Sequence, residues 1–134
     1  MLDIAQRIVI KIGSTTITDE ANGQVRSEWL AAFAEDVAAL RSQGKEIILV
    51  TSGAIALGAR RLGLDKGGRG SLADAQAAAA VGQIALSGLW AELLGSHDLA
   101  AAQLLLTLED MEDRRRYLNA TATLARLLDA GAVP

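Results

Sequence analysis

Two short apolar runs, each followed at once by a glycine-containing polar turn, constrain the fold more than any other feature of this chain. The first run, RIVIKI at 7–12, is rich in β-branched residues and ends at Gly13. The second, EIILV at 46–50, leads into the turn Thr-Ser-Gly at 51–53. Apolar runs of this length are typical of strands buried on both faces of a sheet. The pattern therefore predicts two strands of one sheet, each ending in a polar turn.

The segments between and after these runs have the spacing of helices. Between them, apolar residues recur every three or four positions from Leu30 to Leu40, after a candidate N-cap at Ser27 and before a candidate C-terminal cap at Gly44. Three further helices are predicted, at 53–62, 72–94 and about 110–128, and Gly131 caps the last of them. A third strand is predicted at 99–106 and a flexible loop at 65–71. Strands that alternate with helices predict an α/β fold, a three-layer αβα sandwich with a mainly parallel sheet.

The last residues of the chain resemble the start of another strand. Gly131 is followed by Ala132, Val133 and Pro134, much as Gly44 is followed by the second apolar run. A sheet whose next strand is missing exposes an unpaired edge. We therefore expect residues 1–134 to be the N-terminal part of a domain whose remainder is absent here.

Composition narrows the chemistry open to such a fold. The 134 residues include no cysteine and one histidine, His97, which excludes disulfides, thiolate metal sites, cysteine nucleophiles and histidine-based triads within this chain. A lone histidine in a polar loop is expected to be a surface residue. Any chemistry must therefore use lysine, serine, threonine, aspartate, asparagine and backbone amides.

The net charge and the hydropathy of the chain argue against nucleic-acid and membrane partners. The chain has 13 basic and 16 acidic residues, a net charge of −3, so it has no general attraction for a phosphate backbone and we expect no nucleic-acid partner. The longest apolar stretch, 75–95, contains two glutamines, a serine and a glutamate, which favours a buried helix over a membrane span. We expect a cytoplasmic protein without a membrane partner.

Lys11 is the first candidate functional residue. It lies near the end of an apolar strand, where an ammonium group favours an anionic partner. Gly13 and Ser14 follow with amide and hydroxyl donors at the carboxyl end of the strand, where open α/β sheets bind ligands. The alternative is an edge-strand lysine that points into solvent.

Ser52, Gly53 and Ala54 form the second candidate site, between a strand and a helix. The first amides of a helix and its dipole favour a phosphate or a carboxylate, and Gly53 permits close approach of the backbone. The alternative is a plain N-cap by Ser52. Because the two turns should meet across neighbouring parallel strands, together they predict a cradle for a phosphorylated ligand, although no P-loop sequence occurs.

Two further features have structural explanations. The acids and bases of 109–116 suit the dipole of a helix and pairing along its surface. The small residues at 77–82 permit close helix packing, either in the core or between subunits.

Several motifs in order along the chain resemble those of the amino acid kinase family. They are K-I-G-S-T at 11–15, V-T-S-G-A-I at 50–55, A-A-V-G-Q at 79–83, Q-L-L-L-T-x-x-D-M at 103–111 and D-R-R-R-Y-L-N at 113–119. A single glycine after Lys11, and Ser52-Gly53-Ala54 in place of a Gly-Gly or His-Gly pair, favour the glutamate-phosphorylating branch over the carbamate and acetylglutamate kinases. Both the separate enzyme and the kinase half of a bifunctional proline-pathway enzyme fit, and the short N-terminus favours the bacterial form.

The resemblance implies an activity and roles for the candidate residues. It implies ATP-dependent phosphorylation of the L-glutamate side-chain carboxylate, the first step toward proline, with Mg²⁺ accompanying ATP. Lys11 matches the catalytic lysine that contacts the ATP phosphates, with Gly13 and Ser14 on the phosphate side. Ser52 matches the glutamate-binding serine, with Gly53 and Ala54 beside it. No residue of this segment is expected to be a dedicated metal ligand.

The resemblance also implies a homo-oligomer, which we expect to use the small-residue face of 72–94, and feedback inhibition by proline. The family continues beyond the counterpart of Pro134 with an Asn-Glu-x-Asp segment and further substrate and adenine contacts. We therefore expect the 134-residue chain alone to be inactive. The alternative is that it serves only as a catalytically incomplete binding or assembly module.

Overall fold

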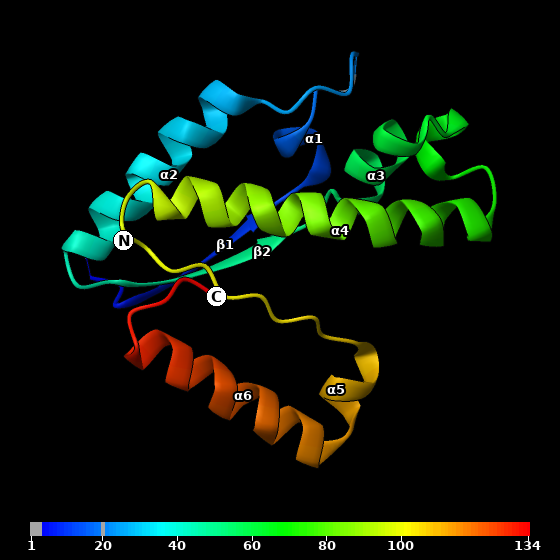
Figure 1. Ribbon diagram of the computed structural model, residues 1–134. Helices are drawn as coiled ribbons and strands as arrows, with labels where there is room; N and C mark the ends of the chain where they lie inside the picture. Colours follow the sequence, from blue (N-terminus) through cyan, green and yellow to red (C-terminus); the bar gives the residue numbers. More distant parts are fainter. Residues whose placement is uncertain (1–3, 20) are drawn as a thin grey trace.

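The computed structural model describes residues 4–19 and 21–134, and Figure 1 shows how their elements are arranged. In chain order the elements are β1 (Arg7–Ile12), α1 (Ser14–Ile17), α2 (Ser27–Ser42), β2 (Glu46–Thr51), α3 (Ala54–Leu62), the 3₁₀ turn η1 (Asp65–Gly68), α4 (Leu72–Gly95), α5 (Leu108–Glu112) and α6 (Arg114–Asp129).

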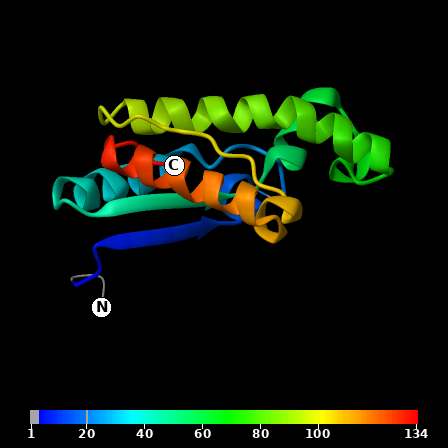
Figure 2. The same ribbon diagram turned by 90° about the horizontal axis from the view of Figure 1, so that it is seen from below.

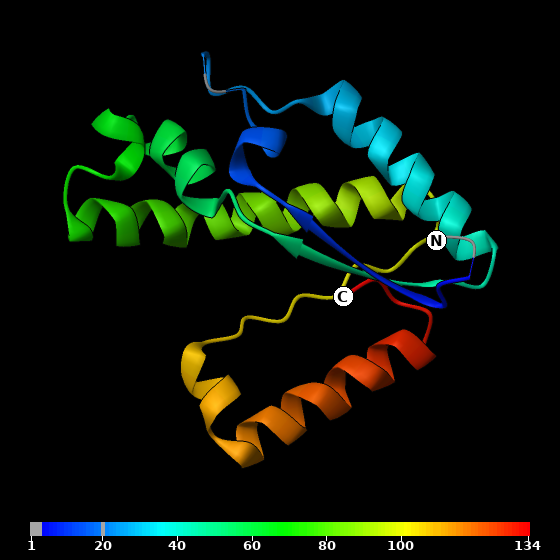
Figure 3. The ribbon, with the colours of Figure 1, turned by 180° about the vertical axis from the view of Figure 1, so that it is seen from behind.

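Strands β1 and β2 pair in parallel, with Arg7 opposite Glu46 and Ile12 opposite Thr51. This confirms the two predicted strands and their shared direction. Helix α2 connects them across one face of the sheet (Figure 3). Both strands consequently end at the same edge, which is the requirement for their two turns to meet.

The third predicted strand, 99–106, is wrong for most of its length. Ala101 forms only an isolated parallel bridge with Val133, through hydrogen bonds from Val133 N to Ala100 O (2.8 Å) and from Ala102 N to Val133 O (3.0 Å). On the other side, Leu49 N of β2 donates to Pro134 O at 2.9 Å. A strand needs a partner along its whole length, and the described chain offers one to this segment only around Val133.

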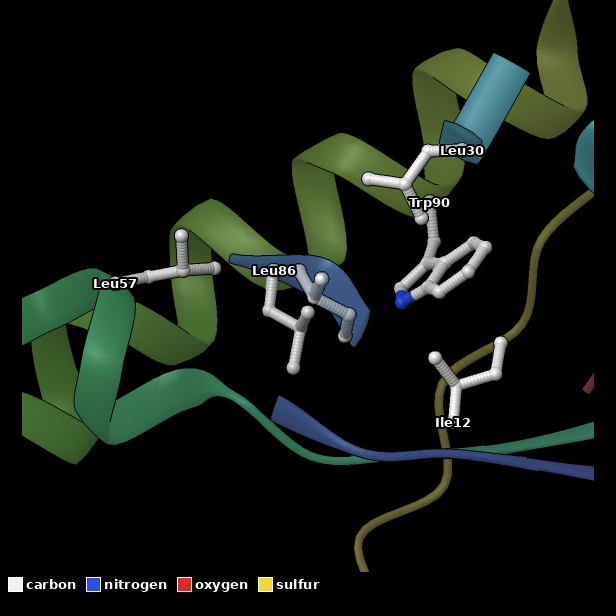
Figure 4. Packing of buried hydrophobic residues seen from close by; sticks show 6 residues of the cluster. Ile12, Leu30, Leu57, Leu86 and Trp90 are labelled. Atoms are coloured by element: carbon white, nitrogen blue, oxygen red, sulfur yellow. The ribbon is translucent and has the colours of Figure 1, made fainter. Parts of the chain in front are cut away.

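The core lies between the sheet and helices α2 and α4. Ile12, Leu30, Leu86 and Trp90 belong to one buried cluster, and Figure 4 shows Leu86 and Trp90 extending from α4 toward the strand that carries Ile12. A second cluster, around Val37, Ile47, Leu94 and Val133, continues the core toward the other end of the sheet. Burial of these side chains is what fixes the sheet against the helices.

The opposite face of the sheet is largely open. Helix α6 lies on this side, as Figure 2 shows, but Leu128 is its only buried residue and β1 remains uncovered. Val9 is 60% exposed and Val50 is 49% exposed. The prediction that both strands are buried on two faces is therefore wrong in this chain, because α6 covers only part of the second face.

The helix boundaries follow local capping. Gly44 and Gly131 have positive φ angles and follow helix ends, as predicted. Ser27, by contrast, makes no capping hydrogen bond at the start of α2. The single helix predicted over 110–128 is split, because the Asp113 carboxylate accepts from Arg116 N (2.8 Å) while Asp113 itself adopts an extended conformation.

The small residues of α4 serve packing within the chain. A Cβ added to Gly82 would lie 1.6 Å from Ala54 O, and one added to Gly58 would lie 1.8 Å from Ala78 O. Helices α3 and α4 therefore meet backbone to backbone, and the Ala78 and Gly82 part of the expected subunit contact is occupied by α3. Length and composition alone would allow α4 to cross a membrane, a test that the core helix of a soluble protein also passes.

Candidate functional site

Lys11 is the last residue but one of β1, and its side chain is exposed. It lies on the open face of the sheet, opposite to the face that carries Ile10 and Ile12 in the core. The sequence predicted apolar surroundings for the Lys11 ammonium group, and this is wrong because the side chain is exposed. Burial is therefore no reason for Lys11 to need an anionic partner. Instead, Lys11 is a cation that a ligand at the strand end can reach.

The turn after β1 is held by the core. Gly13 precedes the single-turn helix α1, whose last residue, Ile17, is fully buried. Thr18 N and Thr18 Oγ1 both donate to Ser14 O, at 2.9 and 3.1 Å. The position of Ser14 at the strand end is thus determined by an anchored apolar side chain and by two hydrogen bonds.

The turn after β2 is tied directly to the end of β1. Ser52 N donates to Ile12 O at 3.2 Å, and Ser52 Oγ is 3.4 Å from the same oxygen. The N-cap of α3 is Gly53, and no side chain caps this helix. The alternative interpretation of Ser52 as a plain N-cap is therefore wrong, because its hydroxyl is bound to the neighbouring strand.

Gly53 brings the two turns into contact. Its φ of 115° strongly favours glycine, and a Cβ built there would lie 3.5 Å from Ile17 Cδ1 and 3.8 Å from Ser14 Cα. The backbone at Gly53 therefore lies beside the first turn of α1. Ala54, the next residue, begins α3 and is half-buried.

The structure thus brings the predicted residues to one edge of the sheet. Lys11, Gly13 and Ser14 come from the end of β1, and Ser52, Gly53 and Ala54 from the end of β2. The first amides of α3 have no partner within their helix, and the helix dipole adds a partial positive charge there. Such an edge can hold an anionic ligand next to the Lys11 ammonium group.

One residue of this region was not indicated by the sequence. Trp90 of α4 donates its indole N–H to Thr51 Oγ1 at 3.2 Å, one residue before Ser52. Its helical spacing predicts only a core residue, which it also is, at 7% exposure. The only signal in the sequence is chemical, since a buried indole N–H needs an acceptor.

The other candidate features lie outside this site. Among the described ranges, 4–19 and 21–134, no group of three or more acidic or histidine side chains is gathered to hold a metal ion. His97 is half-buried in the turn after α4. A groove of about 800 Å³ opens between the segment 23–27, α3 and α4, and none of the predicted site residues lines it.

Comparison with known proteins relates this chain to a family. The model of the amino acid kinase family matches residues 6–134. A UMP kinase from Bacillus anthracis has a similar fold, with a TM-score of 0.55 and 18% sequence identity over 96% of this chain and 50% of that protein.

Curated relatives are much more similar in sequence. A protein named glutamate 5-kinase from Novosphingobium aromaticivorans is 66% identical over 128 residues, which are 96% of this chain and 34% of the relative. Proteins of the same name from Zymomonas mobilis and Sphingopyxis alaskensis are 62% and 61% identical, again over 96% of this chain, and 32% and 34% of those proteins are covered. This chain thus spans about a third of the length of these relatives.

Proposed function

This chain belongs to the amino acid kinase family, and on that premise we propose that the full-length protein containing it is a glutamate 5-kinase. The observation that carries the proposal is the contact of the two turns, where the Gly53 backbone lies beside Ser14 at the carboxyl edge of two parallel strands. The proposed reaction is transfer of the γ-phosphoryl group of ATP to the side-chain carboxylate of L-glutamate.

The chemistry makes few demands on protein side chains. A carboxylate oxygen of glutamate forms a bond to the γ-phosphorus, the bond from that phosphorus to the bridging oxygen breaks, and ADP leaves with the electron pair. The products are an acyl phosphate and ADP. The attacking carboxylate is ionised at neutral pH, so no general base is needed. Catalysis then consists of positioning and of stabilising charge, which suits a site without cysteine or a histidine pair.

The proposed roles divide between the two strand ends. Lys11 carries the one positive charge among the proposed site residues, and its ammonium group would stabilise charge on the transferring phosphoryl group. Gly13 and Ser14 would lie beside the phosphates of the Mg²⁺–ATP substrate. Ser52, Gly53 and Ala54 would hold glutamate, with the α3 amides facing its carboxylate.

The proposal extends to the pathway, the cellular location and the assembly of the enzyme. It places the protein in the first step of proline biosynthesis in the cytoplasm, as a homo-oligomer subject to feedback inhibition by proline. The structure adds one restriction, since the part of the small-residue face formed by Ala78 and Gly82 already packs against α3. A subunit contact through α4 would have to use another of its faces.

The test is an assay of the full-length protein with ATP, Mg²⁺ and L-glutamate, in which hydroxylamine traps the acyl phosphate. We expect a glutamate-dependent hydroxamate and one ADP for each. Aspartate, N-acetylglutamate and UMP serve as matched acceptors that should give little turnover. Phosphorylation of UMP or N-acetylglutamate in preference to glutamate would overturn the proposal.

A further inference from the structure

Trp90 links the core to the turn after β2, which is the candidate glutamate site. Its ring packs in the buried cluster with Leu30 and Leu86, and Figure 4 shows it extending from α4 toward the strands. Phe33 meets the indole edge to face, with ring centroids 6.0 Å apart and an angle of 73°. A large aromatic ring held in this way has little freedom to rotate, so the direction of its N–H is fixed by the core.

The indole N–H is the first of two linked hydrogen bonds. Trp90 Nε1 donates to Thr51 Oγ1 at 3.2 Å, and Thr51 Oγ1 donates in turn to Ser52 O, also at 3.2 Å. Since the indole can only donate, its bond makes the Thr51 hydroxyl an acceptor on that side and directs its own hydrogen toward Ser52. Bonds linked in this way strengthen one another.

The second bond determines the orientation of one peptide group. In a trans peptide the C=O and the following N–H point in opposite directions. A hydroxyl that holds Ser52 O therefore directs the Gly53 N–H away from Thr51. Gly53 has a positive φ, and because glycine has no Cβ its backbone can also adopt other conformations. The orientation of the Ser52–Gly53 peptide therefore depends on a hydrogen bond from outside it.

We propose that Trp90 is a positioning residue for the glutamate site, and that it acts through Thr51 to orient the Ser52–Gly53 peptide. This inference rests on the proposed function, because it assigns that peptide to the binding of glutamate. Trp90 is buried, and no contact with substrate is assigned to it. Its effect should fall on binding in the ground state and the transition state alike, which raises the KM for glutamate and leaves kcat nearly unchanged.

The decisive variant in the full-length protein is Thr51→Val, which keeps the shape and the β-branch of threonine and removes the hydroxyl. We expect its glutamate KM to rise about threefold to tenfold, the effect of one lost hydrogen bond, with little change in kcat. Thr51→Ser keeps the hydroxyl and should retain a KM close to that of the wild type. Trp90→Phe should raise the glutamate KM in the same way.

Ser87→Ala is the matched control. Ser87 lies on α4 one turn before Trp90, and its hydroxyl bonds to Gln83 O and to the Gln103 side chain and not to the turn. Its removal should leave the glutamate KM unchanged. An equal rise of KM in Ser87→Ala and Thr51→Val would show general loosening of α4 and would overturn the inference.

A spectroscopic measurement tests the link independently of turnover. With ¹⁵N-labelled tryptophan in the full-length protein, the indole resonance that disappears in Trp90→Phe is that of Trp90. We expect this resonance to move when glutamate is added and to move again in Thr51→Val. The inference is wrong if the wild type is active and Thr51→Val keeps either the wild-type KM or the wild-type resonance. A wild type without glutamate-dependent turnover would instead refute the proposed function, and this inference with it.

Discussion

Two cations on the same face of β1 show how position within a strand determines the role of a side chain. Arg7, at the amino end, is paired with Glu46 on β2, with 2.6 Å between Arg7 Nε and Glu46 Oε2. Lys11, at the carboxyl end, faces Val50 in the register, and no carboxylate of the described residues pairs with it. Only Lys11 is therefore available to an anionic ligand at the edge where the two turns meet.

Lys11→Ala in the full-length enzyme should lower kcat about 10²- to 10³-fold, the usual cost of removing one preorganised donor to a developing charge. The glutamate KM should change much less, because the interaction strengthens as charge moves toward the bridging oxygen. Steady-state kinetics measure both. Arg7→Ala removes a cation from the other end of the same face and should leave kcat unchanged. Equal losses in the two variants would contradict the role given to Lys11.

Ser52→Ala should have the opposite kinetic signature. Its hydroxyl and the adjacent Gly53 amide are assigned to glutamate, so the glutamate KM should rise with little change in kcat. Titration of glutamate at saturating ATP measures the effect. Ser42→Ala is the control, since Ser42 Oγ donates to Ala39 O within α2, at 2.8 Å. A wild-type KM in Ser52→Ala would remove Ser52 from the glutamate site.

At the scale of elements, the contact between α3 and α4 holds the second turn in place. Helix α3 begins directly after Gly53, so any movement of α3 on α4 moves the candidate glutamate site. The close approach depends on Gly58 and Gly82, each of which faces backbone atoms of the other helix. Fold and site are therefore coupled through two residues that carry no side chain.

Gly82→Ala should destabilise the protein by about 1–3 kcal/mol or more, because the added methyl group would overlap a backbone carbonyl that cannot move alone. Thermal unfolding measures the loss. Gly88→Ala is the control on the same helix, since a Cβ there has nothing within 4 Å. It should be neutral or stabilising by about 0.5–1 kcal/mol. A Gly82→Ala protein as stable as Gly88→Ala would show that the two helices are not in backbone contact.

The stability of the start of α5 should depend on pH. Hydrogen bonds from the Thr107 backbone N–H and hydroxyl to the Asp110 carboxylate lower the pKa of Asp110 below its usual value, helped by the charge of Arg116. A lowered pKa means that the stabilisation is complete above the ordinary aspartate pKa, near 3.9, and is lost as the pH falls through the lower, folded value. NMR titration of the Asp110 carboxyl should show this, and Thr107→Val should return the pKa toward normal. An ordinary pKa in the wild type would contradict the capping interaction.

At the scale of the whole molecule, one face of the sheet remains open. On this face Val9 is 60% exposed and Val50 is 49% exposed, and outside the strands Leu105 and Leu118 are also half exposed or more. This chain spans about a third of the length of its curated relatives. An exposed apolar face of this kind is typical of a surface that other structure covers.

We therefore expect the 134-residue chain, produced alone, to bind a hydrophobic dye such as ANS and to give no hydroxamate with glutamate, ATP and Mg²⁺. The full-length protein should bind the dye less, per molecule, and should turn over. The two measurements on both proteins test this directly. Turnover by the short chain close to that of the full-length protein would show that the described residues already contain a complete site.

The sequence by itself determined the elements whose signals are local. The β-branched runs predicted β1 and β2, helical spacing predicted α2, α3 and α4, and the glycines at 44 and 131 marked helix ends, because propensity and capping act over a few residues. The motifs of 11–15 and 50–55 also indicated the family that the comparison supports. The roles of Lys11 and Ser52 remain predictions.

Only the tertiary structure decided what depends on partners distant in the sequence. The segment 99–106 has the composition of a strand but pairs only where Val133 lies beside it. The Ser52 hydroxyl could cap a helix or bond to another strand, and the nearness of Ile12 O determined which. Trp90 reads as a core residue at helical spacing, and only the packing of α4 over β2 brings its N–H to Thr51. In each case the local sequence allows more than one structure. Contacts between residues distant in the sequence determine which one forms, and no local pattern encodes them.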